Sequence, residues 1–393
     1  NKTTSGTVTL TGANTYTGLT TVSAGTLAYG ASNVIASGGV TVDGATSVLA
    51  LGASHTDTVG TVTLSNGGNI TGTGTSALTS TGTFEMQSGN VSAILAGSGI
   101  ALNKTTSGTV TLTGANTYTG LTTVSAGTLA YGASNVIASG GVTVDGATAV
   151  LDLGASHTDT VGTVTVANGG SITGTGTSAL TSTGTFELQS GSVGAILAGG
   201  TGIAVNKTTS GTVTLTGANT YTGVTTISGG VLSVGTIGNG GVAGNLGQAG
   251  TGAGNIVFDG GTLQYTGANA STNRNFTINS GKTAVIDVTT NNLTISGAAA
   301  ATNGGLTKIG AGILTLSGAN AYTGLTTVNA GMLGYGASNA IGSGDVLVDG
   351  ATAILNLGTN RTDTVGTVTL AGGGSITGTG TSALTTTGTF EIQ

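Results

Sequence analysis

An internal repeat of about 102 residues constrains this chain more than any other feature. The segment Asn-Lys-Thr-Thr-Ser-Gly begins at Asn1, again at Asn103 and a third time at Asn206. The repeated lysines lie 102, 103 and 101 residues apart along the chain; they are Lys2, Lys104, Lys207 and Lys308. Tandem similarity of this kind is the signature of a repeat architecture. Near-identical copies indicate selection for length, because a catalytic site needs no duplicate.

The repeats divide the chain into four domains, which we expect to form one continuous solenoid. They comprise residues 1–102, 103–205, 206–305 and 306–393. The third repeat diverges in its second half, over residues 235–305, and the fourth is truncated. The chain begins and ends inside a repeat, so we interpret it as a piece of a longer repetitive protein.

Each repeat consists of short runs in which apolar and polar residues alternate. Examples are Thr7-Val8-Thr9-Leu10 and Thr61-Val62-Thr63-Leu64, and such runs are separated by Gly, Asn, Asp or Ser. Period-two alternation with β-branched residues predicts strands, and no segment has the periodicity of a helix. The chain is therefore expected to be all-β.

The short strands favour a parallel β-helix over a sandwich or barrel. Glycine, at 77 of 393 residues, would supply the corners, and the absence of proline leaves every backbone N–H available for pairing. At about 20–25 residues per coil, each repeat would contain four or five coils.

Composition excludes several classes of protein. The chain has no cysteine, which excludes disulfide scaffolds, thiolate metal sites and cysteine nucleophiles. Seven basic and thirteen acidic residues give a net charge of −6, which excludes a basic nucleic-acid binder. No apolar run reaches the roughly 18 residues of a membrane-spanning helix.

One segment carries residue types found in catalytic triads. Its members are Ser54, His55 and Asp57 in the first repeat and His157 and Asp159 in the second. Residues two apart on a strand share a face but lack triad geometry, and the fourth repeat has Arg361 in place of the histidine. We therefore expect solvated loops or corners at these positions.

The carboxylates are too sparse for calcium or for a polysaccharide-cleaving site. Asp43, Asp145 and Asp349 each stand in a Val-Asp-Gly segment, which predicts a turn. No catalytic, cofactor-binding or metal-binding residue is predicted, no cofactor is expected, and the chain is not expected to be an enzyme.

The repeated lysines and tyrosines each admit two interpretations. We expect the lysines to keep strand edges soluble, with a cationic docking stripe as the alternative. The tyrosines share a side with nearby asparagines and are expected to pack at corners, with glycan stacking as the alternative; the pairs are Asn14/Tyr16, Asn116/Tyr118, Asn219/Tyr221 and Asn320/Tyr322.

Paired threonines raise the further hypothesis of an ice-binding face. Such a face needs a Thr-x-Thr pair at the same place in every coil, but pairs such as Thr61/Thr63 and Thr71/Thr73 move with the repeat. The alternative is that threonine is simply a good outward-facing strand residue.

The segment Gly-Ala-Asn-x-Tyr-Thr-Gly, which occurs at Gly12, Gly114, Gly217 and Gly318, resembles the passenger-associated strand repeat of bacterial autotransporters. The resemblance implies a right-handed parallel β-helix that is exported across the outer membrane to the surface of a diderm bacterium. The family includes adhesins, biofilm and aggregation factors, and stalks.

These observations favour a non-enzymatic extracellular stalk or fibre, either a surface filament or a biofilm-matrix component. We expect it to self-associate head-to-tail or laterally, with no nucleic-acid partner and no membrane span in this segment. The alternative is an adhesin that binds glycans or neighbouring cells through its lateral face. Its most plausible patch is the divergent segment 235–305, which contains Arg274 and Lys282.

Overall fold

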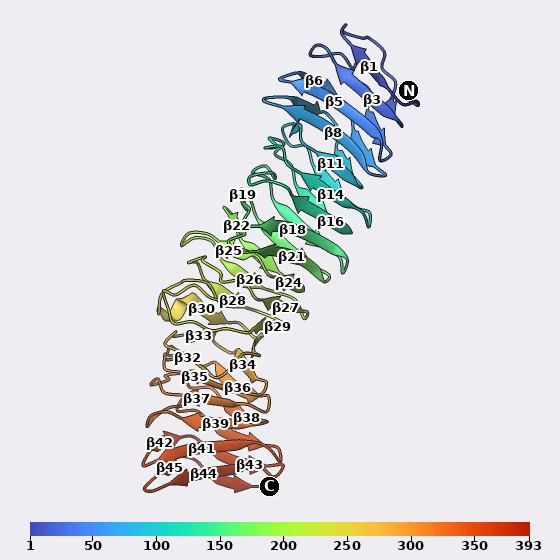
Figure 1. Ribbon diagram of the computed structural model, residues 1–393. Coiled ribbons are helices and arrows are strands. Elements are labelled where there is room, and N and C mark those ends of the chain that lie inside the picture. Colours follow the sequence, from blue (N-terminus) through green and yellow to red (C-terminus); the bar gives the residue numbers. More distant parts are fainter. The chain divides into compact units, whose positions relative to one another are not determined.

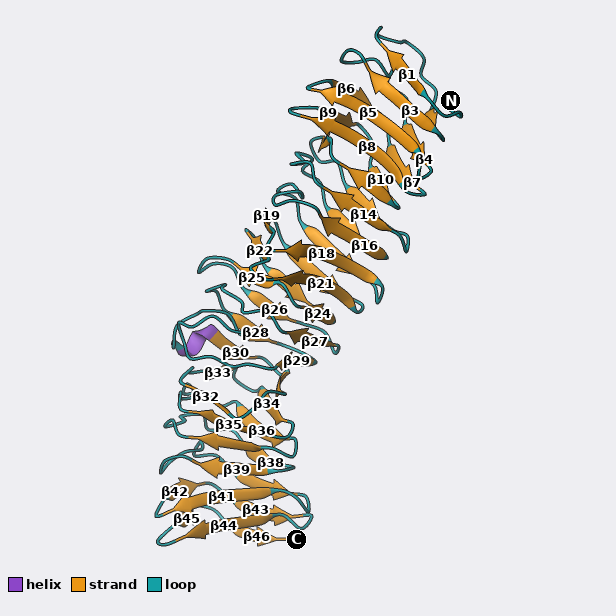
Figure 2. Cartoon of the chain, in the orientation of Figure 1, coloured by secondary structure: helices purple, strands orange, loops and turns teal.

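The computed structural model describes all residues from Asn1 to Gln393 and consists almost entirely of β-strands. The single helical element is a 3₁₀ turn, η1 (Ala253–Asn255). The chain forms two compact units: residues 1–186 with 191–196, and residues 187–190 with 197–393. Figure 1 labels the strands, and Figure 2 shows how loops alternate with them.

The first unit contains parallel ladders on three faces of the coil. Face one contains β2 (Thr20–Val22), β4 (Val40–Asp43), β7 (Val62–Ser65), β10 (Phe84–Met86), β13 (Leu102–Lys104), β15 (Thr122–Val124), β17 (Val142–Asp145) and β20 (Val164–Ala167). Face two contains β1 (Thr7–Leu10), β3 (Gly25–Tyr29), β5 (Ser47–Ala53), β8 (Gly68–Thr73), β11 (Gly89–Val91), β14 (Thr109–Leu112), β16 (Gly127–Tyr131), β18 (Ala149–Ala155), β21 (Gly170–Thr175) and β24 (Gly191–Val193). Face three contains β6 (Thr56–Val59), β9 (Ala77–Ser80), β12 (Ile94–Ala96), β19 (Thr158–Val161) and β22 (Ala179–Ser182).

The second unit is built from the same kinds of ladder. One contains β26 (Val205–Lys207), β28 (Thr225–Ile227), β30 (Ile256–Phe258) and β33 (Thr277–Ile278). Another contains β27 (Thr212–Leu215), β29 (Val231–Val234), β31 (Thr262–Tyr265), β34 (Thr283–Val288), β36 (Gly305–Ile309), β38 (Thr326–Val328), β40 (Val346–Asp349), β43 (Val368–Ala371) and β46 (Phe390–Ile392). The remaining strands are β32 (Ala270–Thr272), β35 (Asn292–Ile295), β37 (Ile313–Leu316), β39 (Met332–Tyr335), β41 (Ile354–Thr359), β44 (Ser375–Thr379), β42 (Thr362–Val365) and β45 (Ala383–Thr386). The strands β23 (Phe186–Leu188) and β25 (Ile196–Ala198) include residues of both units.

The register of face one gives the length of each coil. Thr20 pairs with Val40, Val40 with Val62, Val62 with Phe84, and Phe84 with Leu102, so successive coils advance by 18–22 residues. Five such steps make one repeat, at the upper end of the predicted number. The prediction of a parallel β-solenoid is confirmed, and the chain makes about 18 turns.

The longest coil lies in the divergent half of the third repeat. Thr225 pairs with Ile256, 31 residues ahead, because residues 235–255 form an extra loop that contains η1. Ordinary coil length returns directly afterwards, since Val257 pairs with Thr277.

The core is a set of stacked inward-facing columns produced by alternation along each strand. On face one, Val40 and Val42 of β4 are fully buried while Thr41 between them is half-exposed. Val62 and Leu64 of β7 repeat the pattern one coil later. Each coil therefore contributes its own hydrophobic stabilisation, at about 25 cal/mol per Å² of buried apolar surface.

The corners use left-handed backbone as expected. Asn66 and Gly67 have φ angles of 50° and 83° between β7 and β8, a conformation that asparagine and glycine adopt at little cost. None of the helical structure in the chain is long and apolar enough to cross a bilayer.

Candidate functional site: the buried polar groups of the repeats

The four repeated lysines lie in the core, which corrects the expectation that they stand on exposed strand edges. Lys104, Lys207 and Lys308 are fully buried, and Lys2 is 8% exposed. Each occupies one position of an otherwise apolar inward column, where Lys104 pairs with Val124. The alternation already placed the lysine inward, two residues after the buried Leu102. The expectation of an exposed edge gave the charge more weight than this alternation.

Backbone carbonyl groups solvate each buried ammonium. Lys308 Nζ donates to the carbonyl oxygens of Ile309 at 2.7 Å, Gly310 at 2.8 Å and Ala330 at 3.2 Å. The first two acceptors belong to the turn that follows the lysine, and Ala330 belongs to the next coil. No carboxylate lies within ion-pair distance, because the chain's single ion pair joins Lys282 to Asp259.

The same lysine cradle, defined as a repeat lysine with the carbonyl oxygens that it contacts, occurs in all four repeats. In the second, Lys104 Nζ donates to Thr106 and to Ala126, the latter at 2.9 Å. Burial lowers the pKa of Lys104 to about 8, so the ammonium form still predominates at pH 7. Gly127, at φ +64°, lies against this cradle, and a Cβ there would overlap the carbonyl oxygens of Thr106 and Gly108.

Three of the four repeated asparagines bond to the coil before and to the coil after their own. Asn116 Oδ1 accepts a hydrogen bond from the backbone N–H of Leu95 at 2.7 Å, and its Nδ2 donates to the carbonyl of Val136 at 2.5 Å. Asn320 makes the same two bonds, to Ala299 at 2.7 Å and to Ala340 at 2.6 Å. Asn116, Asn219 and Asn320 therefore each tie three consecutive coils together. Asn14 bonds only to its own coil and to the following one, at Gly12 and Val34.

The tyrosines pack at corners, as expected. Tyr118 is fully buried, its ring lies 5.9 Å from that of Phe84, and its hydroxyl shares a 2.7 Å hydrogen bond with Thr122. Tyr221 and Tyr322 are buried in the same way. Glycan stacking on these three tyrosines is excluded by their burial.

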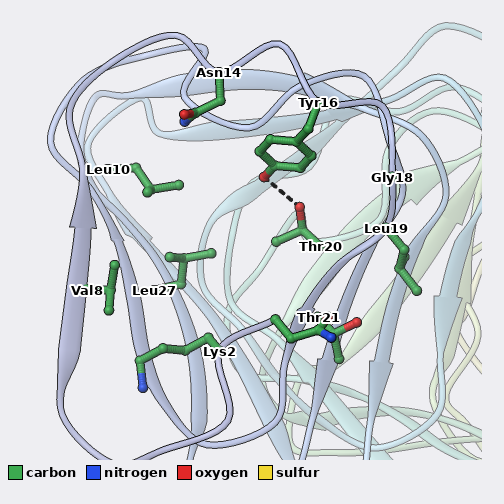
Figure 3. Close-up of a pocket in the computed structure, with 11 residues that line it drawn as sticks. Lys2, Val8, Leu10, Asn14, Tyr16, Gly18, Leu19, Thr20, Thr21 and Leu27 are labelled. Atoms are coloured by element: carbon green, nitrogen blue, oxygen red, sulfur yellow. Dashed lines mark hydrogen bonds between the residues drawn. The ribbon is translucent and has the colours of Figure 1, made fainter.

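In the first repeat the corresponding residues line a cavity of about 400 Å³. Figure 3 shows Tyr16 directed toward Thr20, and Lys2 and Leu10 also line this cavity. Tyr16 is 40% exposed, whereas its three counterparts are fully buried. The hydrogen bond between tyrosine and threonine is thus present in all four repeats.

The passenger-associated-transport-repeat model matches residues 1–28, 102–130, 205–234 and 306–333, which are the segments that contain the lysine, asparagine and tyrosine. The chain carries four passenger-associated-transport repeats. This confirms the resemblance to autotransporter passengers.

One curated relative carries the same kind of sequence. Over 122 residues the chain is 44% identical to "Adhesin BmaC autotransporter" of Brucella suis biovar 1 (strain 1330). That segment covers 30% of this chain and 4% of the relative, so the chain spans a small fraction of that protein's length. No solved structure matched the chain.

Outside the transport repeats, a second buried polar pair recurs three times. Asp159 is 3% exposed, and its carboxylate accepts hydrogen bonds from the backbone N–H groups of Ile137 at 2.8 Å and Thr160 at 2.7 Å. Burial raises the pKa of Asp159, and these two amides partly offset the shift. The hydroxyl of Tyr131 is buried beside this carboxylate, and burial together with the Asp159 charge raises the pKa of the tyrosine.

These tyrosine–aspartate pairs correct the expectation of solvated aspartates, and the sequence contained a signal for them. The pairs are Tyr29/Asp57, Tyr131/Asp159 and Tyr335/Asp363. The third repeat, which has Val234 in place of the tyrosine, also lacks the aspartate segment. The two residues therefore vary together among the copies, as contacting residues do.

The histidines occupy corners and are not part of a triad. His55 Nδ1 hydrogen-bonds to the backbone carbonyl of Leu51 at 2.9 Å, while Asp57 is bonded to the amides of Ile35 and Thr58. The same histidine contact recurs at His157. No group of three or more His, Asp or Glu side chains is placed to hold a metal ion.

The acidic turns and the threonines lie as predicted. Asp43 ends β4 at a turn, and its Oδ1 accepts hydrogen bonds from Ser65 at 2.8 Å and Asn66 at 2.6 Å. In the ladder of face one, Thr63 pairs with Thr41 on one side and Glu85 on the other. The same-place requirement for an ice-binding array is therefore not met on this face.

The divergent segment buries Arg274, which corrects the expectation that it belongs to a lateral binding patch. Arg274 is 2% exposed and donates to the backbone carbonyls of Gly238 at 2.9 Å, Ala249 at 3.0 Å and Gly247 at 2.7 Å. It holds the 235–255 loop on the solenoid. Lys282, by contrast, is 49% exposed.

Proposed function

We propose that the chain is a non-enzymatic stalk segment of an autotransporter-type adhesin, displayed at the surface of a diderm bacterium. The supporting observation is that the buried asparagine of the second, third and fourth transport repeats bonds to both the preceding and the following coil. Asn116 joins Leu95 to Val136, for example, and takes part in no surface site. Such a module adds length without a new core, because solenoid stability is nearly additive along the stack and each repeat contributes its own share.

The adhesin part of the proposal rests on the relative whose name contains that word. Surface display rests on the four transport repeats. The stalk part rests on this chain's own residues, because the two histidines, the buried tyrosines and the buried aspartates are engaged in structural contacts in the repeats that carry them.

Changing the number of repeats in the full-length surface protein tests the stalk. Removing residues 103–205 should shorten the displayed structure by five coils, or about 24 Å at 4.8 Å per coil. Adhesion should persist at reduced reach and should be restored when an extra copy of residues 1–102 replaces the deleted one. Complete loss of adhesion that the replacement does not restore would contradict the stalk and favour a binding site within residues 103–205.

A cavity beside the 235–255 loop supports a second candidate, an adhesive site for glycans or cell surfaces in the third repeat. The cavity measures about 550 Å³ and is lined by small residues together with Asn245, Tyr265 and Asn269. Val242, on the same loop, is 54% exposed.

Substituting this surface distinguishes the two candidates. Val242→Ser with Asn269→Ala alters the cavity region and keeps the backbone carbonyl groups that bind Arg274, including that of Val242 itself. A matched control is Thr41→Ser on face one. Cell binding that falls for the double variant alone supports an adhesive third repeat, and unchanged binding leaves only the stalk.

Self-association is a further part of the proposal. Leu19, Leu121 and Leu325 occupy the same position of their repeats and are 59%, 45% and 45% exposed. We propose that these outward leucines support lateral contact between copies in a surface filament or biofilm matrix. Leu121→Ser with Leu325→Ser should reduce sedimentation-detected association, and unchanged association would refute this contact.

A further inference from the structure

The lysine cradles are the most regular unassigned feature of the molecule. We propose that each cradle is a binding site for a large monovalent cation, which the tethered lysine ammonium fills in the native chain. The class of ligand is a free ammonium or potassium ion, admitted when the lysine side chain is shortened.

The oxygen atoms around each ammonium group suit a monovalent cation. In the third repeat Lys207 Nζ contacts the carbonyl oxygens of Thr208 at 2.5 Å, Thr209 at 2.9 Å and Gly229 at 2.9 Å. An ammonium group has three donors and no acceptor, so these three oxygens satisfy it completely. Rings of backbone carbonyls are also what replaces the hydration shell of potassium in proteins.

The surroundings of the three fully buried lysines are uncharged. Lys104, Lys207 and Lys308 form no ion pair. Divalent cations prefer sites with several carboxylates, whereas neutral carbonyl oxygens suit a single positive charge. The columns of Val and Leu around each lysine keep water out and strengthen the ion–dipole interaction.

The main chain, rather than the side chains, shapes the cradle. The oxygens converge because a glycine at positive φ follows in the next coil in every repeat; these are Gly25, Gly127, Gly230 and Gly331, at φ between 57° and 65°. The acceptor residues differ between copies, from Thr4 and Ala24 to Ile309, Gly310 and Ala330. Main-chain geometry therefore builds the cradle, and it should persist without the lysine.

Ion-specific stabilisation of Lys308→Ala tests the proposal in the whole chain. Unfolding midpoints are compared in the chlorides of ammonium, potassium, sodium and tetramethylammonium at equal ionic strength. The variant should be stabilised by ammonium and potassium over tetramethylammonium, which is too large for the cradle. The wild-type chain and Lys282→Ala, which removes an exposed lysine, should show no such preference. Equal responses of Lys308→Ala in all four salts would overturn the proposal.

The Lys2→Ala variant tests the same cation site if Lys308→Ala does not fold. Lys2→Ala alters only the first coil, and its cradle can be followed by hydrogen exchange of the Ser23 amide, which donates to the Lys2 carbonyl at 2.7 Å. Exchange should slow about tenfold when ammonium is present at about ten times its dissociation constant. Exchange that is identical in ammonium and tetramethylammonium chloride would refute the site.

Discussion

Tyr118 and Thr122 share a 2.7 Å hydrogen bond between hydroxyl groups inside a core made of aliphatic columns. The pair recurs as Tyr221/Thr225 and Tyr322/Thr326, each at 2.8 Å and fully buried. Polar groups placed at the same point of each transport repeat thus form part of the stack itself. Their removal should therefore lower the free energy of unfolding.

Replacing Asn116 should destabilise the coils around it. Asn116→Ala leaves the Leu95 amide and the Val136 carbonyl buried and unpaired, which should cost about 2–4 kcal/mol. Hydrogen exchange of the Leu95 amide measures the local effect. Asn14→Ala is the matched control, because Asn14 is exposed and should cost at most about 1 kcal/mol. Equal costs for the two variants would show that bonding between coils is not the source of the stability.

Two tyrosine-to-phenylalanine changes in the same unit should differ. Tyr118→Phe removes the bond to Thr122 and should cost about 1 kcal/mol. Tyr131→Phe removes a buried hydroxyl that lies beside the Asp159 carboxylate without a hydrogen bond of good geometry, so its effect should be within about 0.5 kcal/mol. Urea unfolding of both variants provides the comparison. A larger loss for Tyr131→Phe would indicate that its hydroxyl is bonded to Asp159 in solution.

Stability should rise as the pH increases from about 8 to about 9.5. Burial lowers the pKa values of Lys104, Lys207 and Lys308 to about 8, whereas an unfolded lysine has a pKa of about 10.4. Between these values the unfolded chain binds more protons, so the free energy of unfolding increases with pH.

The upper limit of this window is set by the buried tyrosines. Burial raises the pKa of Tyr221 and of Tyr322 to about 12, so unfolding favours their ionisation above about pH 10 and stability falls there. Denaturant titrations at stepped pH test both limits. The triple variant with methionine at the three fully buried lysines should lose the rise, and a rise of unchanged size in that variant would contradict this assignment.

Two glycine-to-alanine changes separate backbone strain from crowding. Gly127 and Gly99 both have positive φ, at 64° and 72°, but only Gly127 is enclosed by carbonyl oxygens. Gly127→Ala should cost about 2–5 kcal/mol from strain and overpacking, and Gly99→Ala about 1 kcal/mol from strain alone. Thermal unfolding of the two variants measures the difference, and similar losses would show that the cradle adapts to a methyl group.

The residue pattern alone was sufficient to predict the solenoid. Alternation along runs such as Thr61–Leu64 assigned inward and outward residues, and the spacing of the repeats gave the number of coils, because both depend on local strand geometry. The position of the tyrosine at each corner could also be predicted, because a large aromatic ring between turn-forming residues is most stable when it packs against the coil.

Which charged residues are buried depends on the tertiary structure. Lys104 lies in the core because the carbonyl of Ala126, 22 residues ahead, is brought within 2.9 Å of its ammonium by the next coil. Asp159 and Arg274 are buried for the same reason, since backbone amides or carbonyls of distant segments satisfy them. A charge is buried only where such partners converge, and their convergence depends on how the coils stack rather than on the residues next to it in the sequence.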